Sequence, residues 1–353
     1  MLTPDSTLPD LTASASASKG GLALHAPGRL HLGFLDPAGT LGRPFGSLGL
    51  VIEGFETVVE LRAAAVDSVT AVGPAAQAEV GRARAHLERL REHTGRHGAV
   101  QMRLLRVLPA HAGFGSGTQL ALAIGRAFVQ WHGLAVDNAT LAGWLGRGQR
   151  SGIGIAGFDQ GGLLLDGGPG ANGTAAPLLA RLSLPEAWRV VVVQDTTRQG
   201  LSGIPEQQAL VELPPLPQAV AAEICHHVLM RVLAGAASAD FAAFAAGLTR
   251  VQQLLGDHFA PAQGGSAYTS AAVGQLVQWL AEAHRGRAVA GEEAPHGAAV
   301  GQSSWGPTGF AILPTAAAAE AAVRAVHAAG LVRAGLSLLV VRARNHGATF
   351  SPP

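Results

Sequence analysis

A glycine-rich loop between a strand-like and a helix-like stretch is the feature that most constrains this sequence. The segment PAHAGFGSGTQL (109–120) follows an expected strand at 98–107 and precedes an expected helix from about 116 to 132. Three glycines and a serine fall within six of its positions. Exposed backbone N–H groups and the positive end of a helix dipole make such a junction suited to an anion. The loop therefore predicts a phosphate cradle, with a tight ligand-free turn as the alternative.

The composition allows a sizeable core and disfavours several classes of protein. Of 353 residues, 48% are hydrophobic and 14% are charged, so the chain is long enough for two domains. A formal net charge of +1 without a long basic run argues against a dedicated nucleic-acid-binding protein. The single cysteine, Cys225, excludes a disulfide framework and a Cys-rich metal site, and it fits a reducing compartment. No stretch reaches the run of about 18 apolar residues expected of a membrane span.

The N-terminal segment and the lysine content add two expectations. Residues 1–20 lack the basic start and apolar stretch of a signal peptide, and their Ser, Thr, Pro and Ala content is typical of a disordered tail. We therefore expect a cytoplasmic protein with no membrane partner. The only lysine, Lys19, lies in that tail. Any fixed cation at a functional site must then be an arginine, a protonated histidine or a metal ion.

The order of expected elements predicts an α+β chain of two domains. A Gly- and Pro-rich composition shift at 167–187 marks the expected boundary, giving an N-terminal domain at 21–187 and a C-terminal domain at 188–353. The glycines and short apolar runs of 149–168 favour loop, strand and turn there. The other strands are expected at 56–63, 188–195, 309–314 and 336–344, and the other helices at 76–96, 217–235, 238–256, 267–285 and 315–329.

Three motifs occur in an order that resembles the GHMP superfamily of small-molecule kinases. APGRLHLG begins at Ala26, PAHAGFGSGTQLA at Pro109, and GQSSWGPTGFAI at Gly301. The resemblance implies a domain like the second domain of ribosomal protein S5, followed by a ferredoxin-like domain. The motifs depart from the kinase pattern, because Gly117 and Thr118 replace a serine and an alanine of the kinase loop, and Trp305 and Pro307 interrupt the late glycine motif.

These departures resemble the non-kinase branch of β-ribofuranosylaminobenzene 5′-phosphate synthases. The segments at 147–168 and 197–209 are similar to the same branch, and the likeness spans about residues 22–345. It implies condensation of phosphoribosyl pyrophosphate with 4-aminobenzoate or 4-hydroxybenzoate, with release of CO₂ and pyrophosphate, in tetrahydromethanopterin biosynthesis. It also implies Mg²⁺ as cofactor and a homodimer. Two alternatives stay open: an ATP-dependent GHMP kinase of a sugar or isoprenoid alcohol, and a non-catalytic member that binds a phosphate ligand.

The resemblance assigns two groups of residues to phosphate binding. The loop would supply backbone donors and hydroxyl groups from Gly113, Gly115, Ser116, Gly117 and Thr118. A second anion nest would come from Arg198, Gly200 and Ser202. His111 is ambiguous between capping the loop and touching phosphate. Trp305 could stack on the aromatic acid, although a tryptophan is more often a packing residue.

Three further residues are expected to act in the reaction. Asp159 aligns with the kinase catalytic aspartate, and it would stabilise the developing ribosyl cation or hold Mg²⁺ together with Ser116; the alternative is a turn residue. Arg29 and His31 share one face of an extended segment, and Arg29 is expected to bind phosphate as a two-donor fork. Their alternatives are a surface ion pair and a satisfied polar residue near the core. Asp166 is a weaker candidate, because Asp-Gly alone indicates a hairpin.

Overall fold

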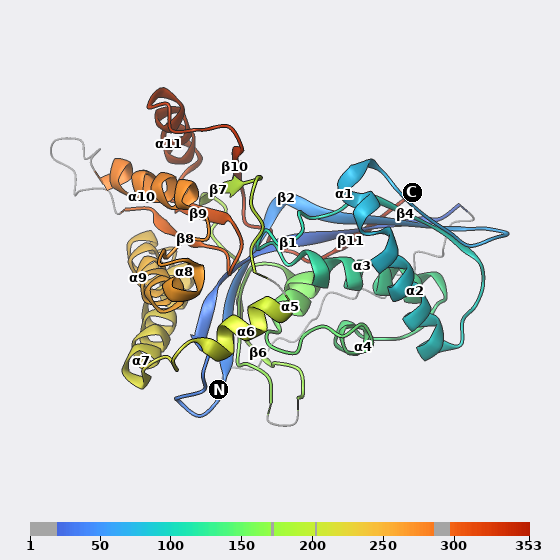
Figure 1. The fold of residues 1–353 in the computed structure, drawn as a ribbon. Coiled ribbons are helices and arrows are strands. Elements are labelled where there is room, and N and C mark those ends of the chain that lie inside the picture. The colour runs from blue at the N-terminus through green and yellow to red at the C-terminus, as the bar shows by residue number, and fades with distance from the viewer. Residues whose placement is uncertain (1–19, 171–172, 202, 286–296) are drawn as a thin grey trace.

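The computed structural model describes residues 20–353 apart from 171–172, 202 and 286–296, and it contains two β-sheets flanked by helices (Figure 1). The first sheet has the strand order β11-β1-β2-β4-β3, with β5 paired to β2 and β6 paired to β5. Its strands are β1 (Leu22–Asp36), β2 (Phe45–Ala63), β3 (Ser68–Ala71), β4 (Val100–Arg106), β5 (Leu163–Asp166), β6 (Leu178–Leu182) and β11 (Thr349–Ser351). The second sheet has the order β10-β7-β9-β8 and comprises β7 (Arg189–Asp195), β8 (Ala299–Gln302), β9 (Thr308–Leu313) and β10 (Leu336–Val341).

A long antiparallel pair, β1 and β2, is the backbone of the first sheet. Its register runs from Leu22 opposite Leu61 to Asp36 opposite Phe45. The register shifts twice, between Pro27 and Arg29 and between His31 and Gly33. Such irregularities bend a strand and re-aim its side chains. Both lie in the first sequence motif, so they determine where its polar side chains point.

Helices cover one face of the first sheet. They are α1 (Gly73–Ala78), α2 (Val80–Thr94), α3 (Ser116–Trp131), α4 (Asn138–Trp144) and α5 (Ile153–Gln160). The central helix α3 contacts β1 and β2, and its inner side chains, including Leu120, Ile124 and Phe128, are fully or almost fully buried. Figure 1 shows α3 and α5 beneath the strands, with α2 and α4 farther out. Burial of these apolar side chains holds the start of α3 in a fixed place over the sheet.

The helical elements after β7 are α6 (Ile204–Glu212), α7 (Gln218–His227), the π-helical turn η1 (Val228–Leu233), α8 (Ala234–Ser238), α9 (Phe241–Phe259), the 3₁₀ turn η2 (Ala260–Gln263), α10 (Ala271–Arg285) and α11 (Ala316–Ala328). Of these, α9, α10 and α11 pack against the second sheet. Helix α9 contacts β8 and also β1, so it joins the two sheets. Among the described residues, one helical stretch, Gln218–Ser238, has the length and composition of a membrane span. Its buried side chains, such as Ile224 and Val232, belong to the main apolar core.

Two features differ from the sequence-based expectation. Residues 153–160 form helix α5 instead of loop, strand and turn. The C-terminal segment leaves the second sheet: β11 pairs antiparallel with β1, and Ala343 forms a bridge to Ile52. The expected C-terminal domain at 188–353 therefore loses its last residues to the first sheet. The physical reason is that the outer edge of β1 needs a hydrogen-bonding partner, which β11 supplies.

Candidate active site

A cavity of about 520 Å³ lies at the beginning of α3, where loops from both parts of the chain meet. The glycine loop forms one wall through His111, Gly113, Gly115, Ser116, Gly117 and Thr118. The segment 146–151, the end of the late motif at 304–306, and α6 form the others. The late motif packs directly on the glycine loop, because the Ser303 hydroxyl donates to the Gly113 carbonyl at 2.7 Å. This contact explains why two motifs so distant in sequence belong to one site.

The glycine loop ends as an open helix N-terminus. Helix α3 begins after Gly115, which has a left-handed φ of 75°, and no side chain caps it. The first amide groups of a helix have no intrahelical acceptor, so uncapped ones are available to an anion. A Cβ on Gly115 would stand 3.1 Å from Cζ of Arg29, and one on Gly117 would stand 3.2 Å from Nη1 of Arg147. The glycines therefore let two guanidinium groups approach the loop backbone closely.

Arginines give the cavity its charge. Its lining includes Arg29, Arg82, Arg147 and Arg150. The Nη1 of Arg29 donates to the Gly113 carbonyl at 2.9 Å, but Nε of Arg29, Nε of Arg147 and Nη1 of Arg150 are buried without a hydrogen-bond partner in the described structure. Burial lowers the pKa of Arg29 to about 10 and also lowers the pKa of Arg147, whose neighbours Arg82 and Arg89 add repulsion. Buried donors without acceptors, held beside like charges, favour a bound anion.

One carboxylate is present in the described lining of this cavity. Glu206 of α6 pairs with Arg150 at 2.8 Å. It balances one of the guanidinium groups and leaves the cavity cationic. Glu206, Arg82, Arg147 and Arg150 were all missed by the sequence analysis. The available signal was the pair of arginines in GRGQR (146–150), a segment already noted for its likeness to the synthase branch.

His31 lies at the cavity wall as a neutral imidazole. Its side chain is 4% exposed. Burial, followed by the charges of Arg29 and Arg150, holds its pKa well below 6.5. The backbone N–H of Gly33 donates to its Nδ1 at 3.3 Å, which leaves the ring proton on Nε2. That Nε2 is buried without a partner in the described residues, so His31 presents one unused N–H donor.

The structure does not bring Asp159 to the cavity. Asp159 is at the C-terminal end of α5, where its Oδ1 accepts a hydrogen bond from Nδ2 of Asn138, and burial raises its pKa. The residue of α5 that lines the cavity is Gly154, near the other end of the helix. Helix α5 places Gly154 at the cavity and carries Asp159 more than one turn farther along the chain. Ser116 lines the cavity and Asp159 does not, so the two expected metal ligands do not share this lining.

Asp166 has a structural role. Its buried carboxylate accepts hydrogen bonds from the backbone N–H groups of Gly152 at 2.7 Å and Ile153 at 3.2 Å, at the start of α5. It also accepts from the N–H of Ser47 in β2 at 3.0 Å. Asp166 thus ties the start of α5 to the first sheet. Across the described residues, no group of three or more His, Cys, Asp or Glu side chains could hold a metal ion.

Of the expected second anion nest, the described residues Arg198 and Gly200 do not line this cavity. Arg198 is directed away from the cavity, with Nε 3.8 Å from Asp195 Oδ2 and Nη1 donating to the Thr269 carbonyl at 3.3 Å. Gly200 is a packing position, because its N–H donates to the His111 carbonyl at 2.9 Å and a Cβ there would collide with Trp305. Ser202 lies outside the described residues. His111 has φ 56° and lines the cavity as part of the loop wall.

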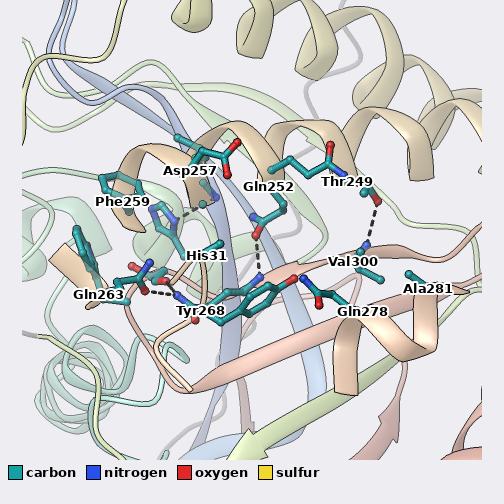
Figure 2. A pocket seen from close by; sticks show the side chains of 18 of the residues that line it. His31, Thr249, Gln252, Asp257, Phe259, Gln263, Tyr268, Gln278, Ala281 and Val300 are labelled. Atoms are coloured by element: carbon teal, nitrogen blue, oxygen red, sulfur yellow. Dashed lines mark hydrogen bonds between the residues drawn. The ribbon is translucent and has the colours of Figure 1, made fainter. Parts of the chain in front are cut away.

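A second cavity of about 470 Å³ adjoins the first (Figure 2). The two share His31, Phe34, Ser304 and Trp305. Helices α9 and α10 and strand β8 supply most of the remaining lining, which is rich in glutamine and aromatic side chains. Trp305 is 3% exposed and packs against Phe259, with ring centroids 4.7 Å apart. We call the first space the cationic cavity and the second the amide-lined cavity. The four residues that they share, Trp305 among them, form the partition between the two cavities.

Comparison with known proteins agrees with this architecture. The family described as "GHMP kinases N terminal domain" matches residues 81–165. Among solved structures, a homoserine kinase from Cytophaga hutchinsonii superimposes with a TM-score of 0.63 at 16% identity, covering 94% of this chain and 98% of that one. A mevalonate diphosphate decarboxylase from Staphylococcus aureus gives 0.64 at 11% identity, again covering 94% and 98%. The expected two-domain GHMP-like α+β fold is therefore confirmed.

Curated relatives show closer sequence similarity. The β-ribofuranosylphenol 5′-phosphate synthase of Archaeoglobus fulgidus is 35% identical over 245 residues, which is 66% of this chain and 76% of that protein. The synthase of the same name from Methanothermobacter thermautotrophicus is 30% identical over 247 residues, covering 65% and 75%.

Proposed function

This chain belongs to the β-ribofuranosylphenol 5′-phosphate synthase family, and from that premise we propose that it condenses phosphoribosyl pyrophosphate with a para-substituted benzoate, releasing CO₂ and pyrophosphate. It would act as a pentosyltransferase that also decarboxylates its acceptor. The relatives are named for a phenol product, so 4-hydroxybenzoate stands beside 4-aminobenzoate as an acceptor to test. The product would enter tetrahydromethanopterin biosynthesis. A cytoplasmic homodimer remains part of the proposal, and light scattering would test the dimer.

The cationic cavity is the observation that carries this proposal. The ribosyl donor has two phosphate-bearing ends, and the cavity offers an uncapped helix N-terminus and guanidinium groups from separate segments. Several of their donors are buried without a partner in the described chain, as a phosphate-filled site would need. The one described carboxylate of the lining is already paired with Arg150. This arrangement suits binding and departure of pyrophosphate.

The reaction requires pyrophosphate to leave ribose C1 and CO₂ to leave the acceptor ring. The bond between ribose C1 and the pyrophosphate oxygen breaks with both electrons leaving on pyrophosphate. The acceptor carbon that bears the carboxylate attacks C1, and the C–CO₂ bond pair then returns to the ring as CO₂ departs. Arg29, Arg147 and Arg150 would stabilise the charge growing on the leaving group. Pre-positioned electrostatic stabilisation of this kind is usually the largest contribution to catalysis.

Magnesium would fit this site mainly through the substrate. Mg²⁺ binds phosphate oxygens together with few protein carboxylates, and it keeps several waters. The Ser116 hydroxyl and the Glu206 carboxylate are oxygen donors in the described lining that could assist in holding it. When bound, it would neutralise charge on the pyrophosphate. We expect turnover to require Mg²⁺, so a chelator should abolish it.

The kinase alternative lacks a base in the described cavity. A kinase that deprotonates its alcohol with a protein carboxylate would need that carboxylate free and facing the reacting hydroxyl. Helix α5 presents Gly154 there, and Glu206 is paired with Arg150. The geometry therefore favours a reaction that needs no protein carboxylate to deprotonate a hydroxyl.

Product analysis tests the proposal directly. The protein is mixed with Mg²⁺, phosphoribosyl pyrophosphate and either 4-aminobenzoate or 4-hydroxybenzoate labelled in the carboxyl group. We expect labelled CO₂ and pyrophosphate in equal amounts, and no reaction when ATP replaces the donor. Phosphorylation of an alcohol by ATP without CO₂ release would instead establish a kinase. Pyrophosphate binding without turnover of either acceptor would indicate the non-catalytic alternative.

A further inference from the structure

We propose that the amide-lined cavity is the acceptor site and that it holds the aromatic acid in one orientation, carboxylate toward His31 and para substituent toward Gln278. This inference rests on the proposed function and extends it to the second substrate. The cavity shares His31, Phe34, Ser304 and Trp305 with the cationic cavity. Two substrates that form a bond must meet at such a partition, so ribose C1 and the attacking ring carbon belong beside these shared residues.

The walls nearest the partition suit a planar ring. Phe34, Phe259, Tyr268 and Trp305 all line the cavity, and burial raises the pKa of Tyr268 to about 12, so its hydroxyl stays protonated. His31 meets Phe34 edge-on with ring centroids 4.5 Å apart. Aromatic groups arranged around a space contribute both apolar area and ring-to-ring contacts to an aromatic ligand. A sugar or an aliphatic alcohol would gain less from these walls.

Charge sets the orientation of the acid. No arginine or lysine lines the amide-lined cavity among its described residues, whereas Asp257 and Glu282 do. A carboxylate placed deep in this cavity would therefore meet only neutral or negative side chains. At the partition it would meet the unused Nε2–H of His31, with Arg29 and Arg150 beyond. The carboxylate should face the partition, which also places its carbon where the new bond forms.

A neutral donor suits a carboxylate that must leave as CO₂. A guanidinium group clamped on this carboxylate would stabilise the ground state more than the transition state, since the negative charge disappears during the reaction. The imidazole of His31 is held neutral by burial and by the neighbouring arginines. It can orient the carboxylate through one hydrogen bond without holding it by charge.

The cavity extends well beyond a single ring on the side away from the partition. Its lining follows α9 from Thr249 to Phe259, and ten residues of helix span about 15 Å. Figure 2 shows His31, Phe259 and Gln263 at one end and Thr249, Gln278 and Ala281 at the other. Gln278 is exposed, so this end opens to solvent. A para substituent directed there has room to grow.

A hydrogen-bond network fixes the wall between the two ends. Gln252 donates to the Leu32 carbonyl at 2.6 Å and accepts from the N–H of Gln302 at 2.7 Å. Gln302 in turn donates to Oε1 of Gln263 at 2.8 Å and to the Ser304 carbonyl at 2.7 Å. These bonds join β1, α9, η2 and the late motif. They hold the partition in position relative to the cavity, as a site that aligns two substrates requires.

Changing the shape of the amide-lined cavity tests whether it is the acceptor site. Ala267→Leu adds bulk to the wall, and Tyr268→Ala removes an aromatic wall; neither residue lines the cationic cavity. We expect each to raise KM for the benzoate by about tenfold or more, a loss of about 1.4 kcal/mol, while KM for phosphoribosyl pyrophosphate stays unchanged. The matched control is Ala262→Leu in η2, which lines neither cavity. Folding is checked by circular dichroism, and calorimetry with pyrophosphate confirms an intact donor site.

Lengthening the para substituent tests the orientation. Wild-type protein should accept 4-(butylamino)benzoate with a KM similar to that of 4-aminobenzoate. Gln278→Trp should block the longer acceptor and spare the shorter one.

The outcomes separate the site from the function. An unchanged KM for the benzoate in folded Ala267→Leu and Tyr268→Ala proteins, with wild type releasing labelled CO₂, would overturn the site while leaving the function intact. Rejection of the longer acceptor by wild type would overturn the orientation. If wild type releases no CO₂, the proposed function fails, and calorimetric titration of these proteins with 4-aminobenzoate and pyrophosphate decides the site alone.

Discussion

Arg29 contacts the glycine loop in a way that only a planar guanidinium can maintain. One nitrogen donates to the Gly113 carbonyl, and the group lies against Gly115 with Nε left for a ligand. Arg29→Lys keeps the charge but loses the second donor direction, so we expect KM for phosphoribosyl pyrophosphate to rise about tenfold or more with a smaller change in kcat. Steady-state kinetics would measure both. Arg106→Lys, at an exposed arginine paired with Glu56, is the matched control and should behave like wild type.

Asp159 should be nearly dispensable for turnover. Its carboxylate faces Asn138 of α4 and lies outside the cationic cavity. Asp159→Asn keeps an oxygen acceptor of the same size, so we expect kcat within about threefold of wild type, whereas loss of a well-placed electrostatic group costs roughly 10²-fold. Single-turnover release of labelled CO₂ is the measurement. A hundredfold loss in a folded variant would show that this carboxylate acts in the reaction after all.

The residues that sequence analysis identified are those that lie close together along the chain. Arg29 and His31 belong to one motif, and Gly115 and Ser116 to another, so local pattern was enough to select them. Arg82 could not be selected in that way. It belongs to helix α2, outside every motif, and only tertiary packing brings it to the cavity.

At the scale of elements, strands and long helices were more predictable than the short glycine-rich helix. Strand β7 is a continuous run of buried valines, and helix α3 follows its apolar periodicity. Helix α5 does not, because its glycines weaken intrinsic helix propensity. In the structure, Asp166 compensates for this weak helix propensity, because its carboxylate accepts hydrogen bonds from the backbone N–H groups at the start of α5. That long-range cap has no local sequence signature, so the glycine-rich pattern did not predict helix α5.

Helix α2 carries a buried histidine that should make stability depend on pH. His86 is 4% exposed, and both ring nitrogens lack a partner in the described structure. Burial, followed by repulsion from Arg147, Arg89 and Arg82, lowers its pKa from 6.5 to about 4. Below pH 6.5 the His86 imidazole binds a proton in the unfolded chain, whereas in the folded chain it stays neutral down to about pH 4. The free energy of unfolding should therefore fall as pH falls through this window, by up to roughly 3 kcal/mol from this residue.

His86→Leu isolates that contribution. The variant keeps an apolar group of similar size and removes the titration, so its free energy of unfolding should fall less between pH 6.5 and pH 4 than that of wild type. Urea denaturation at several pH values gives the difference. His97→Leu is a control at an exposed histidine. Equal pH slopes for wild type and His86→Leu would show that His86 binds its proton equally well in the folded and unfolded chain.

At the scale of the whole molecule, a nearly neutral chain concentrates positive charge in one place. The formal net charge is +1, yet the cationic cavity gathers four arginines against one glutamate among its described lining residues. All four arginines come from the first part of the chain, from β1, α2 and the segment 146–151, whereas Glu206 and residues 304–306 reach the cavity from the second part. Mutual repulsion of these arginines should destabilise the empty cavity, and a polyanion should relieve it.

Pyrophosphate should accordingly stabilise the folded protein without any turnover. A ligand at a hundred times its Kd adds about 2.7 kcal/mol to the free energy of unfolding, which raises Tm on the order of 2–4 °C for a chain of this size class. Chloride at matched ionic strength should give no such rise, because it lacks several oxygens to engage separate guanidinium groups.

Glu206→Gln sharpens the test, since it releases Arg150 from its 2.8 Å ion pair and adds one free cation to the cavity. That variant should have a lower Tm alone and a larger rise with pyrophosphate. Its opposite, Arg150→Gln, removes a cation and should show a smaller rise than wild type. Differential scanning calorimetry across the three proteins gives an order, Glu206→Gln above wild type above Arg150→Gln, and any other order would mean that pyrophosphate binds outside this cavity.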